Sequence, residues 1–175
     1  MLNASDALTC EVWDGRVPVA VHLARDESTV HEPPAPFFAL LPRMSYLAQF
    51  EAEIRSHFFE AIAPVEDGVW FEYQGAPLKW HLPLGVVFDS CCASQLRTDA
   101  STVAALPWSL TVHFQAFPEA VMPRCRSLDA LRTSFFHTLK QSVWLRCGNA
   151  KPLTDMPKSE HASLWDAARQ GTRDS

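Results

Sequence analysis

The sequence predicts an α+β fold in which a β-sheet domain is followed by α-helices. Hydrophobic residues alternate with period two in several short segments before residue 122, as in half-buried strands. After residue 123 they recur every three or four residues, as on one face of a helix. We therefore expect a β-sheet domain with an N-terminal lead-in at residues 1–122 and a helix-rich region at residues 123–175.

The composition is that of a globular protein. Of the 175 residues, 47% are hydrophobic, with six tryptophans and eleven phenylalanines, which is enough for a dense core. The net charge of −5 and the lack of a basic cluster argue against a nucleic-acid partner. No apolar run approaches the ~20 residues that span a bilayer, so we expect no transmembrane segment and at most peripheral membrane contact.

Two short strands are expected near the N-terminus. In residues 17–23 hydrophobic side chains alternate, and Pro18 favours an edge strand or a place at the start of the strand. Residues 36–41 are expected to form the second strand, which Pro42 ends. Ahead of both, Ser5 is a candidate cap for a short helix.

A helix is expected next. Its apolar positions are spaced by three and four, with charged side chains between them, over Leu47, Phe50, Ile54, Phe58 and Ala61. The spacing predicts an amphipathic helix of about five turns. It would start near Pro42 and stop before Pro64.

The densest apolar stretch follows, and it predicts a β-hairpin. Residues 69–73 alternate as a strand, Gly75 supplies the positive φ of a turn, and residues 78–82 resume the alternation. In this arrangement Trp80 faces the core. Residues 84–88 are expected to form a compact apolar turn or short helix.

Residues 91–104 are polar and show no regular spacing, which predicts a loop. One more strand is expected at residues 106–117. The resulting order is strand, strand, helix, strand, strand, short helix, strand. That is the β-grasp arrangement of ubiquitin-like domains.

The remaining residues predict two helices. Ser127 is a candidate N-cap, with Asp129 in the first turn where the helix dipole favours an anion. The apolar stripe consists of Leu128, Leu131, Phe135, Leu139 and Val143. Gly148 is expected to end this helix, and residues 151–158 read as a linker. The last helix starts at Ser159 and carries Trp165, for which little chain remains as a cover.

No catalytic, metal or cofactor site is expected from local sequence. Cys125 can be paired with His113 or His137, and Cys91 is a further candidate thiol, yet no activating motif accompanies them. The histidines are dispersed and the six glycines are scattered, so neither a metal site nor a phosphate loop is indicated. With no signal peptide and an odd number of five cysteines, we expect reduced thiols in a cytosolic protein.

Of the four lysines, Lys140 alone falls within a predicted helix. Its position lies to one side of the apolar stripe, so its amine should reach solvent from a rigid element. On spacing alone, an ordinary exposed lysine beside an apolar face is the simpler interpretation.

Four sequence blocks resemble the autophagy protein 5 family. They are Val-Trp-Asp-Gly-Arg-Val-Pro at residues 12–18, Leu-Leu-Pro-Arg-Met-Ser-Tyr-Leu at residues 40–47, residues 69–89 with their Trp-Phe-Glu-Tyr core, and Ala-Leu-Pro-Trp-Ser-Leu-Thr-Val-His-Phe at residues 105–114. The blocks are rich in rare aromatic residues and occur in the family's order.

The resemblance implies a non-catalytic scaffold with an N-terminal ubiquitin-like domain and a helix-rich region. It places at Lys140 the lysine that receives autophagy protein 12 as an isopeptide, delivered by the autophagy conjugating enzymes. With autophagy protein 16, the conjugate acts like a ubiquitin ligase and promotes lipidation of autophagy protein 8. The implied location is the cytoplasm and, peripherally, the membrane of the preautophagosomal structure.

The sequence also departs from the family's pattern. The family's second ubiquitin-like domain is absent from these residues, and the groove for autophagy protein 16 uses it. The loop at residues 91–104 is longer than the family usually carries. We therefore expect either a partial product or a shortened relative. The alternative function is a free-standing ubiquitin-like interaction module without ligase-like activity.

Overall fold

The computed structural model describes residues 11, 13–64, 68–98 and 106–171. The expected helix capped at Ser5 and residues 99–104 of the expected loop lie outside this part. The strands are β1 (Arg16–Leu23), β2 (Phe37–Pro42), β3 (Trp70–Tyr73), β4 (Ala76–Pro77) and β5 (Trp108–His113). The α-helices are α2 (Glu51–His57), α3 (Leu84–Thr98), α4 (Leu128–Cys147), α5 (Lys151–Thr154) and α6 (Lys158–Gln170).

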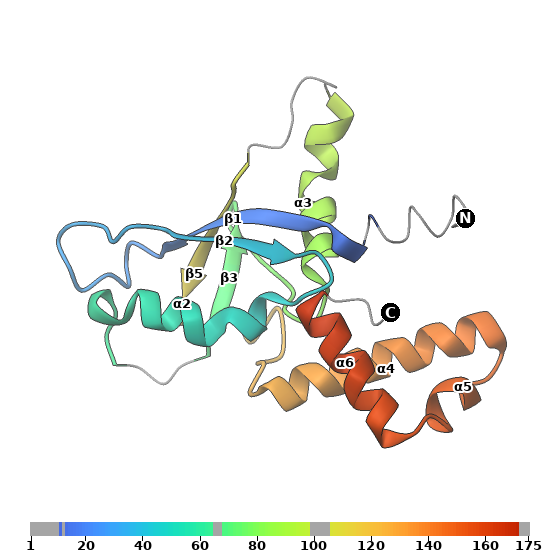
Figure 1. Ribbon diagram of the computed structural model, residues 1–175. Helices are drawn as coiled ribbons and strands as arrows, with labels where there is room; N and C mark the ends of the chain where they lie inside the picture. The colour runs from blue at the N-terminus through green and yellow to red at the C-terminus, as the bar shows by residue number, and fades with distance from the viewer. Residues whose placement is uncertain (1–10, 12, 65–67, 99–105, 172–175) are drawn as a thin grey trace.

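The five strands form one mixed sheet in the order β2-β1-β5-β3-β4. β5, the last strand in sequence, lies parallel to β1 and antiparallel to β3, while β1–β2 and β3–β4 are antiparallel pairs. Two hairpins therefore flank a central last strand. This is the predicted β-grasp arrangement, and the expected α+β fold class is confirmed (Figure 1).

β1 is an interior strand, so the edge position suggested for Pro18 is wrong. Pro18 is the third residue of β1 and not its first, and it is tolerated because the parallel pairing with β5 begins only at Val19, opposite Trp108. Pro18 lies opposite Leu40 of β2, before that ladder starts. The strand keeps its predicted alternation, and its core side consists of Val17, Val19, Val21 and Leu23, all buried.

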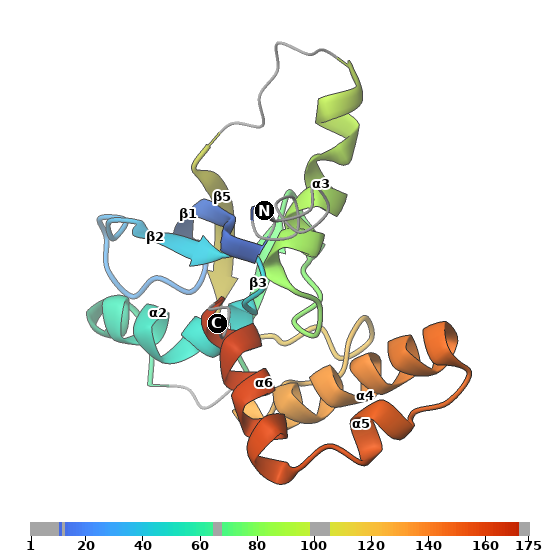
Figure 2. The same cartoon turned by 45° about the vertical axis from the view of Figure 1, so that its right-hand side comes forward.

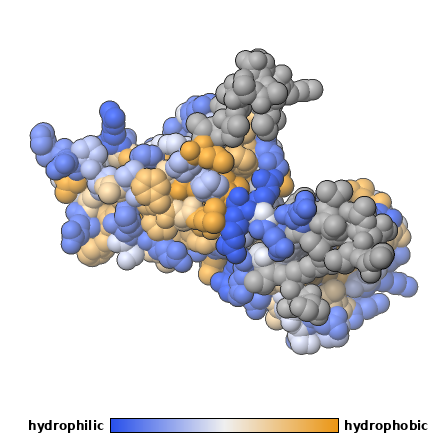
Figure 3. All heavy atoms as spheres, turned by 45° about the horizontal axis from the view of Figure 1, so that its top comes forward, coloured by the Kyte–Doolittle hydropathy of each residue, from blue (hydrophilic) through white to orange (hydrophobic). Residues whose placement is uncertain are grey.

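The core lies on one side of the sheet. Trp108, Leu110 and Val112 of β5 pack there with the buried side of β1, beneath Ile54 of α2 and Leu84 of α3. Outward positions alternate with these, and hydrophobic side chains also reach the surface of the sheet domain (Figure 3). Phe38 and Leu40 of β2 are examples of such exposed outward-facing side chains.

The expected five-turn helix is shorter and interrupted. α2 has seven residues and is flanked by the 3-10 turns Leu47–Phe50 and Phe59–Ala61. The segment after Pro42 does not start the helix, because two of its backbone carbonyls accept hydrogen bonds from the first residues of α3. The carbonyls of Arg43 and Ser45 accept the backbone N–H groups of Gly85 and Leu84, at 2.8 and 2.7 Å, and so satisfy the start of α3.

The second leg of the predicted hairpin is mostly wrong. The turn is present, with positive φ at Gln74 and Gly75, but β4 ends at Pro77. One further bond, from the Leu78 N–H to the Phe71 carbonyl, closes the pair at 2.8 Å. Trp80 then leaves the sheet, and its indole N–H donates to the Pro123 carbonyl at 2.7 Å. Trp80 is half-buried against the helices rather than a residue of the sheet core.

α3 replaces most of the expected loop. It extends from Leu84 through Thr98, where only a short apolar turn and then an irregular segment from residue 91 were predicted. Cys92 is buried against the core from this helix. Ala, Gln, Leu and Arg, which are good helix formers, follow it in the sequence.

The helical region follows the predicted signals closely. Ser127 caps α4 by accepting the Ala130 N–H at 3.2 Å, and Gly148 ends it in the left-handed conformation at φ 69°. Of the predicted apolar stripe, Leu131 alone is fully buried. The expected linker is partly wrong, because Lys151–Thr154 form the short helix α5.

A second hydrophobic cluster, built on Tyr46, Leu131 and Trp165, joins the helices to the sheet domain. Figure 2 shows α6 extending from beside α4 to the sheet domain. Trp165 of α6, expected to lack a cover, is only 9% exposed. Its ring centroid lies 6.2 Å from that of Tyr46, which precedes the first 3-10 turn, and 5.4 Å from that of Phe135 on α4. The helices are thus packed on the sheet domain through aromatic side chains.

Tyr46 makes this junction sensitive to alkaline pH. Burial raises the pKa of Tyr46 to about 12 from its ordinary value of 10.0. The folded state therefore keeps the phenol protonated where the unfolded chain would ionise it. This contribution to stability is fully present below about pH 10 and is lost as the pH rises toward 12. We expect a tyrosinate absorbance step near pH 12 that Tyr46→Phe removes; an unchanged step would contradict it.

Candidate functional site

Lys140 lies in the second half of α4, and its side chain is exposed. The helix that carries it has 20 residues, a side-chain cap at Ser127 and a glycine stop at Gly148. Within the described residues, the Lys140 amine has neither a hydrogen bond nor an ion pair. The structure thus presents a solvent-facing primary amine on a well-capped element, as the sequence predicts.

Two surface hollows meet at Lys140. The first, of about 460 Å³, lies between the end of α4 and Ala150 and is lined mainly by Trp144, Leu145 and Gln141. The second, of about 560 Å³, lies where α4, α5 and α6 meet. His137 and Lys140 line both hollows, so the amine stands on the ridge between them.

The two hollows differ in chemistry. Trp144 and Leu145 are 57% and 77% exposed, which gives the first hollow an apolar wall. The second is less apolar: Arg132 and Lys140 bring two positive charges to it and Asp129 one negative charge, beside the imidazoles of His137 and His161. A partner that reaches Lys140 therefore meets an apolar surface on one side and a cationic surface on the other.

His161 helps to hold these three helices together. Its Nε2–H donates to the Leu153 carbonyl of α5 at 2.8 Å, and its ring stacks on Phe136 of α4 at 4.9 Å. The guanidinium of Arg132 lies over the ring of Phe136, 5.8 Å from the ring centroid. Contacts from α5 and α6 therefore stabilise the part of α4 that carries Lys140.

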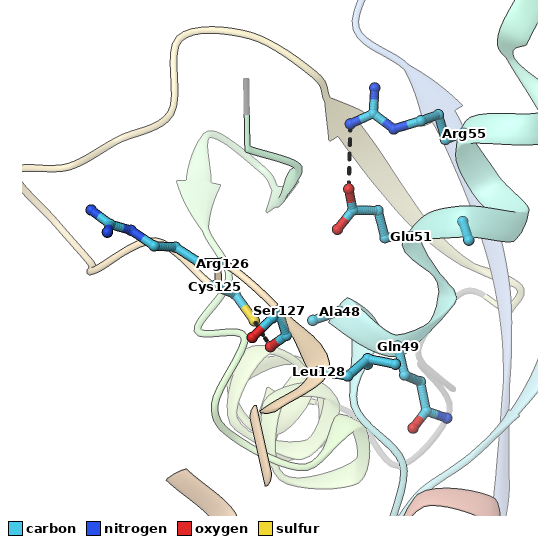
Figure 4. Close-up of a pocket in the computed structure, with 9 residues that line it drawn as sticks. Ala48, Gln49, Glu51, Arg55, Cys125, Arg126, Ser127 and Leu128 are labelled. Atoms are coloured by element: carbon cyan, nitrogen blue, oxygen red, sulfur yellow. Dashed lines mark hydrogen bonds and ion pairs between the residues drawn. The ribbon is translucent and has the colours of Figure 1, made fainter. Parts of the chain in front are cut away.

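The candidate thiols are not assembled into a nucleophilic site. Cys125 borders a hollow of about 270 Å³ between α2 and the start of α4, where its Sγ donates to the Ser127 carbonyl at 3.6 Å (Figure 4). His113 lies in the sheet, stacked on Trp70 at 3.9 Å, and His137 lines the hollows at Lys140. Within the described residues neither imidazole bonds to Cys125.

Burial raises the pKa of the Cys91, Cys92 and Cys125 thiols above their ordinary value. A raised pKa leaves less thiolate at neutral pH, and the thiolate is the nucleophile. We expect iodoacetamide to label the exposed Cys147 before Cys125 in the native protein. The labelling rate of Cys125 should still increase with pH above the pKa of an ordinary thiol. Peptide mass spectrometry measures the labelling rate of each cysteine, and the two rates should become similar in urea. Faster labelling of Cys125 than of Cys147 would contradict this ranking.

The described residues hold neither a cluster of metal ligands nor a membrane-spanning helix. Groups of three or more histidine, cysteine or carboxylate side chains that could hold a metal ion are absent from that part of the chain. The helices described there are also too short or too polar to cross a membrane.

Comparison with known families decides the family of the chain. The family profile described as "Autophagy protein ATG5, UblA domain" matches residues 12–114, which is more than half of the sequence. The chain belongs to the autophagy protein 5 family. A second profile of the family, "Autophagy protein ATG5, alpha-helical bundle region", matches residues 128–175. The resemblance read from the four sequence blocks is confirmed.

Individual relatives agree with this assignment. Autophagy protein 5 of Oryza sativa subsp. indica is 37% identical over 163 residues, which cover 93% of this chain and 40% of that protein. The Arabidopsis thaliana protein is 34% identical over 163 residues, covering 93% of this chain and 46% of its own length. This member of the family thus spans less than half the length of these two plant relatives.

A solved structure shows the same fold. The crystal structure of Kluyveromyces marxianus Atg5 superposes with a TM-score of 0.75, covering 90% of this chain and 61% of that one. Its sequence identity is 20%, so this likeness concerns the fold alone.

The sequence pointed to Lys140 but missed its surroundings. The sequence suggests His137 only as a partner for Cys125, and no local motif marks Arg132, Trp144 or His161. His137 and Trp144 stand three residues before and four residues after Lys140, which are the spacings of neighbours on one helix face. That spacing was the available signal. His161 could not be placed without the packing of α6.

Proposed function

We propose that this chain is a non-catalytic scaffold of autophagy and that Lys140 accepts autophagy protein 12 through an isopeptide bond. The observation that carries the proposal is an exposed amine on the long capped helix α4, at the meeting point of two hollows. Membership of the autophagy protein 5 family supports the role in autophagy.

Lys140 suits an acceptor better than the other lysines do. An acceptor amine needs reach, a stable mounting and neighbouring surface that a conjugating enzyme can grip. Lys79 follows the end of β4 outside a helix, and Lys151 and Lys158 begin the helices α5 and α6. Only Lys140 among the four lies within a helix interior and lines both hollows.

The chemistry proposed for this chain is that of a substrate. The conjugating enzymes supply a thioester, and the amine attacks its carbonyl carbon with loss of the thiol. As part of the same proposal, the conjugate joins autophagy protein 16 and promotes lipidation of autophagy protein 8. These events take place in the cytoplasm and, peripherally, at the membrane of the preautophagosomal structure.

A reconstituted conjugation reaction tests the proposal. Purified modifier, activating enzyme and conjugating enzyme are incubated with this chain and, in parallel, with the Arabidopsis thaliana autophagy protein 5. We expect a covalent adduct with the summed mass of modifier and chain. If the plant protein is conjugated and this chain, folded by circular dichroism, is not, the proposal fails.

A further inference from the structure

We propose that His137 accepts the proton that the Lys140 amine loses when the amine attacks a thioester. The inference rests on the proposed function of Lys140 and adds a second residue to the acceptor site. The juxtaposition that carries it is the sharing of both hollows by these two side chains.

Helix geometry brings the two groups together. Residues three apart on a helix are surface neighbours, with Cβ atoms about 5–6 Å apart. Helical side chains also lean toward the N-terminus, so Lys140 covers the turn that contains His137. The second hollow agrees with this lean, because Lys140 lines it together with Phe136, Thr133 and Asp129, all from preceding turns.

His137 is available for proton transfer, whereas the other histidine of this surface is engaged. Within the described residues His137 is exposed and makes no hydrogen bond or ion pair. The Nε2–H of His161 already donates to the Leu153 carbonyl, and the ring stacks on Phe136. The remaining charged groups of the second hollow are Asp129 and Arg132, while α5 contributes the uncharged Leu153 and Thr154.

The proposed step balances as follows. The Nζ lone pair of Lys140 forms a bond to the carbonyl carbon of a glycyl thioester, and the C–S bond breaks. The sulfur leaves as a thiolate with the electron pair. The proton released from the nitrogen passes to the imidazole of His137 and from there to the thiolate or to water. An imidazole is the side chain best suited to take up and return a proton near neutral pH.

The chain contains a matched comparison for this geometry. Lys158 and His161 are also three residues apart on one helix, but in the reverse order. Lys158 is the first residue of α6, so its side chain leans past the start of the helix, and the ring of His161 is fixed by its bond to the Leu153 carbonyl and its stacking on Phe136. Lys158 is exposed like Lys140, so it reports the reactivity of a lysine without a proton acceptor.

A small thioester probe tests the proposal without any conjugating enzyme. The full chain is treated with an N-acetylglycyl thioester, and peptide mass spectrometry gives the acylation rate of each lysine as a function of pH. At neutral pH we expect Lys140 to react at least about tenfold faster than Lys158. This is below the roughly 10²–10⁴-fold of a well-positioned general base, because His137 is exposed to solvent. His137→Gln should remove this advantage, and His22→Gln, a change at an exposed histidine of β1, should keep it.

The pH profile separates proton transfer from a structural effect. With His137 in place, the Lys140 rate should exceed the Lys158 rate near neutral pH and approach it at alkaline pH, where hydroxide takes up the proton for both amines. Equal rates in the wild-type protein, or a Lys140 advantage that survives His137→Gln, would overturn the proposal. If Lys140→Arg still forms the enzymatic adduct, the proposed function itself fails. If enzymatic conjugation at Lys140 is normal but the probe acylates Lys140 and Lys158 at equal rates, only the proposed role of His137 fails.

Discussion

Replacing Trp108 by alanine is expected to lower the free energy of unfolding by about 3–5 kcal/mol, the range for removal of a large buried aromatic side chain. Trp108 begins β5 at the centre of the sheet and is 2% exposed. Its ring centroid lies 5.5 Å from that of Tyr73 and 5.3 Å from that of Phe88. Deleting it would leave a cavity between the sheet and α3. Urea denaturation followed by circular dichroism measures the loss.

Trp108→Phe provides a matched control. The indole Nε1 of Trp108 is buried without a hydrogen-bond partner in the described part of the chain. Phenylalanine removes this unsatisfied donor and keeps most of the ring, so it should cost less than alanine. Trp80→Ala should also cost less, because Trp80 is half-buried at the junction with the helices. A loss below about 1 kcal/mol for Trp108→Ala would be inconsistent with a core cavity.

Replacing Lys140 by arginine is expected to abolish the adduct with autophagy protein 12 while leaving the fold intact. Arginine stays protonated and cannot act as a nucleophile toward a thioester. It has nearly the helix propensity of lysine, and the position is exposed, so α4 should persist. A gel shift of the conjugation reaction measures adduct formation, and circular dichroism checks the fold.

The three other lysines supply the controls for this experiment. Lys79→Arg, Lys151→Arg and Lys158→Arg change exposed positions that line neither hollow at Lys140. Each should leave the adduct unchanged. An adduct that persists in Lys140→Arg and disappears in one of these variants would move the acceptor to that residue.

Local signals in the sequence predicted much of the fold. Alternation located β1, β3 and β5, an apolar run ended by Pro42 located β2, and the caps at Ser127 and Gly148 located α4. These features succeed because each depends on residues close in sequence. The start of α2 failed for the opposite reason, since the carbonyls of Arg43 and Ser45 bond to residues about forty positions later.

Long-range contacts also explain the errors at two tryptophans. Trp80 continues an alternating pattern, but the Pro123 carbonyl draws its indole toward the helices. No apolar residue near Trp165 in the sequence covers it, and it packs instead on Tyr46 of the sheet domain, which is distant in sequence. Pattern arguments describe which side chains are apolar, and only packing decides which surface they meet.

A buried carboxylate was equally invisible to the sequence. Glu27 lies in a polar loop, yet its side chain is nearly fully buried and accepts the backbone N–H groups of Phe114 and Gln115, at 2.6 and 3.2 Å. His113 lies between Glu27 and Glu72, with its Nδ1 and Nε2 at 3.4 and 3.2 Å from their oxygens. Glu27 thereby satisfies the end of β5, a role that depends on a partner 87 residues away.

The sequence alone predicts Lys140 as the candidate residue, but it does not predict the surface around it. Lys140 stood out because it is the one lysine within a predicted helix and because the resemblance to the family implies an acceptor lysine there. The cationic hollow beside it is assembled from α4, α5 and α6, and α5 was not expected at all. His161 reaches this surface only through the packing of α6 against Phe136.

The most direct measurement is the mass-spectrometric location of the isopeptide bond in the conjugate of the wild-type chain. Trypsin cuts after Arg132 and Arg146 and cannot cut after a modified lysine, so the relevant peptide spans residues 133–146. We predict this peptide in branched form, with the modifier's C-terminal glycine joined to Nζ of Lys140. A branch at Lys79, Lys151 or Lys158, with Lys140 unmodified, would contradict the assignment.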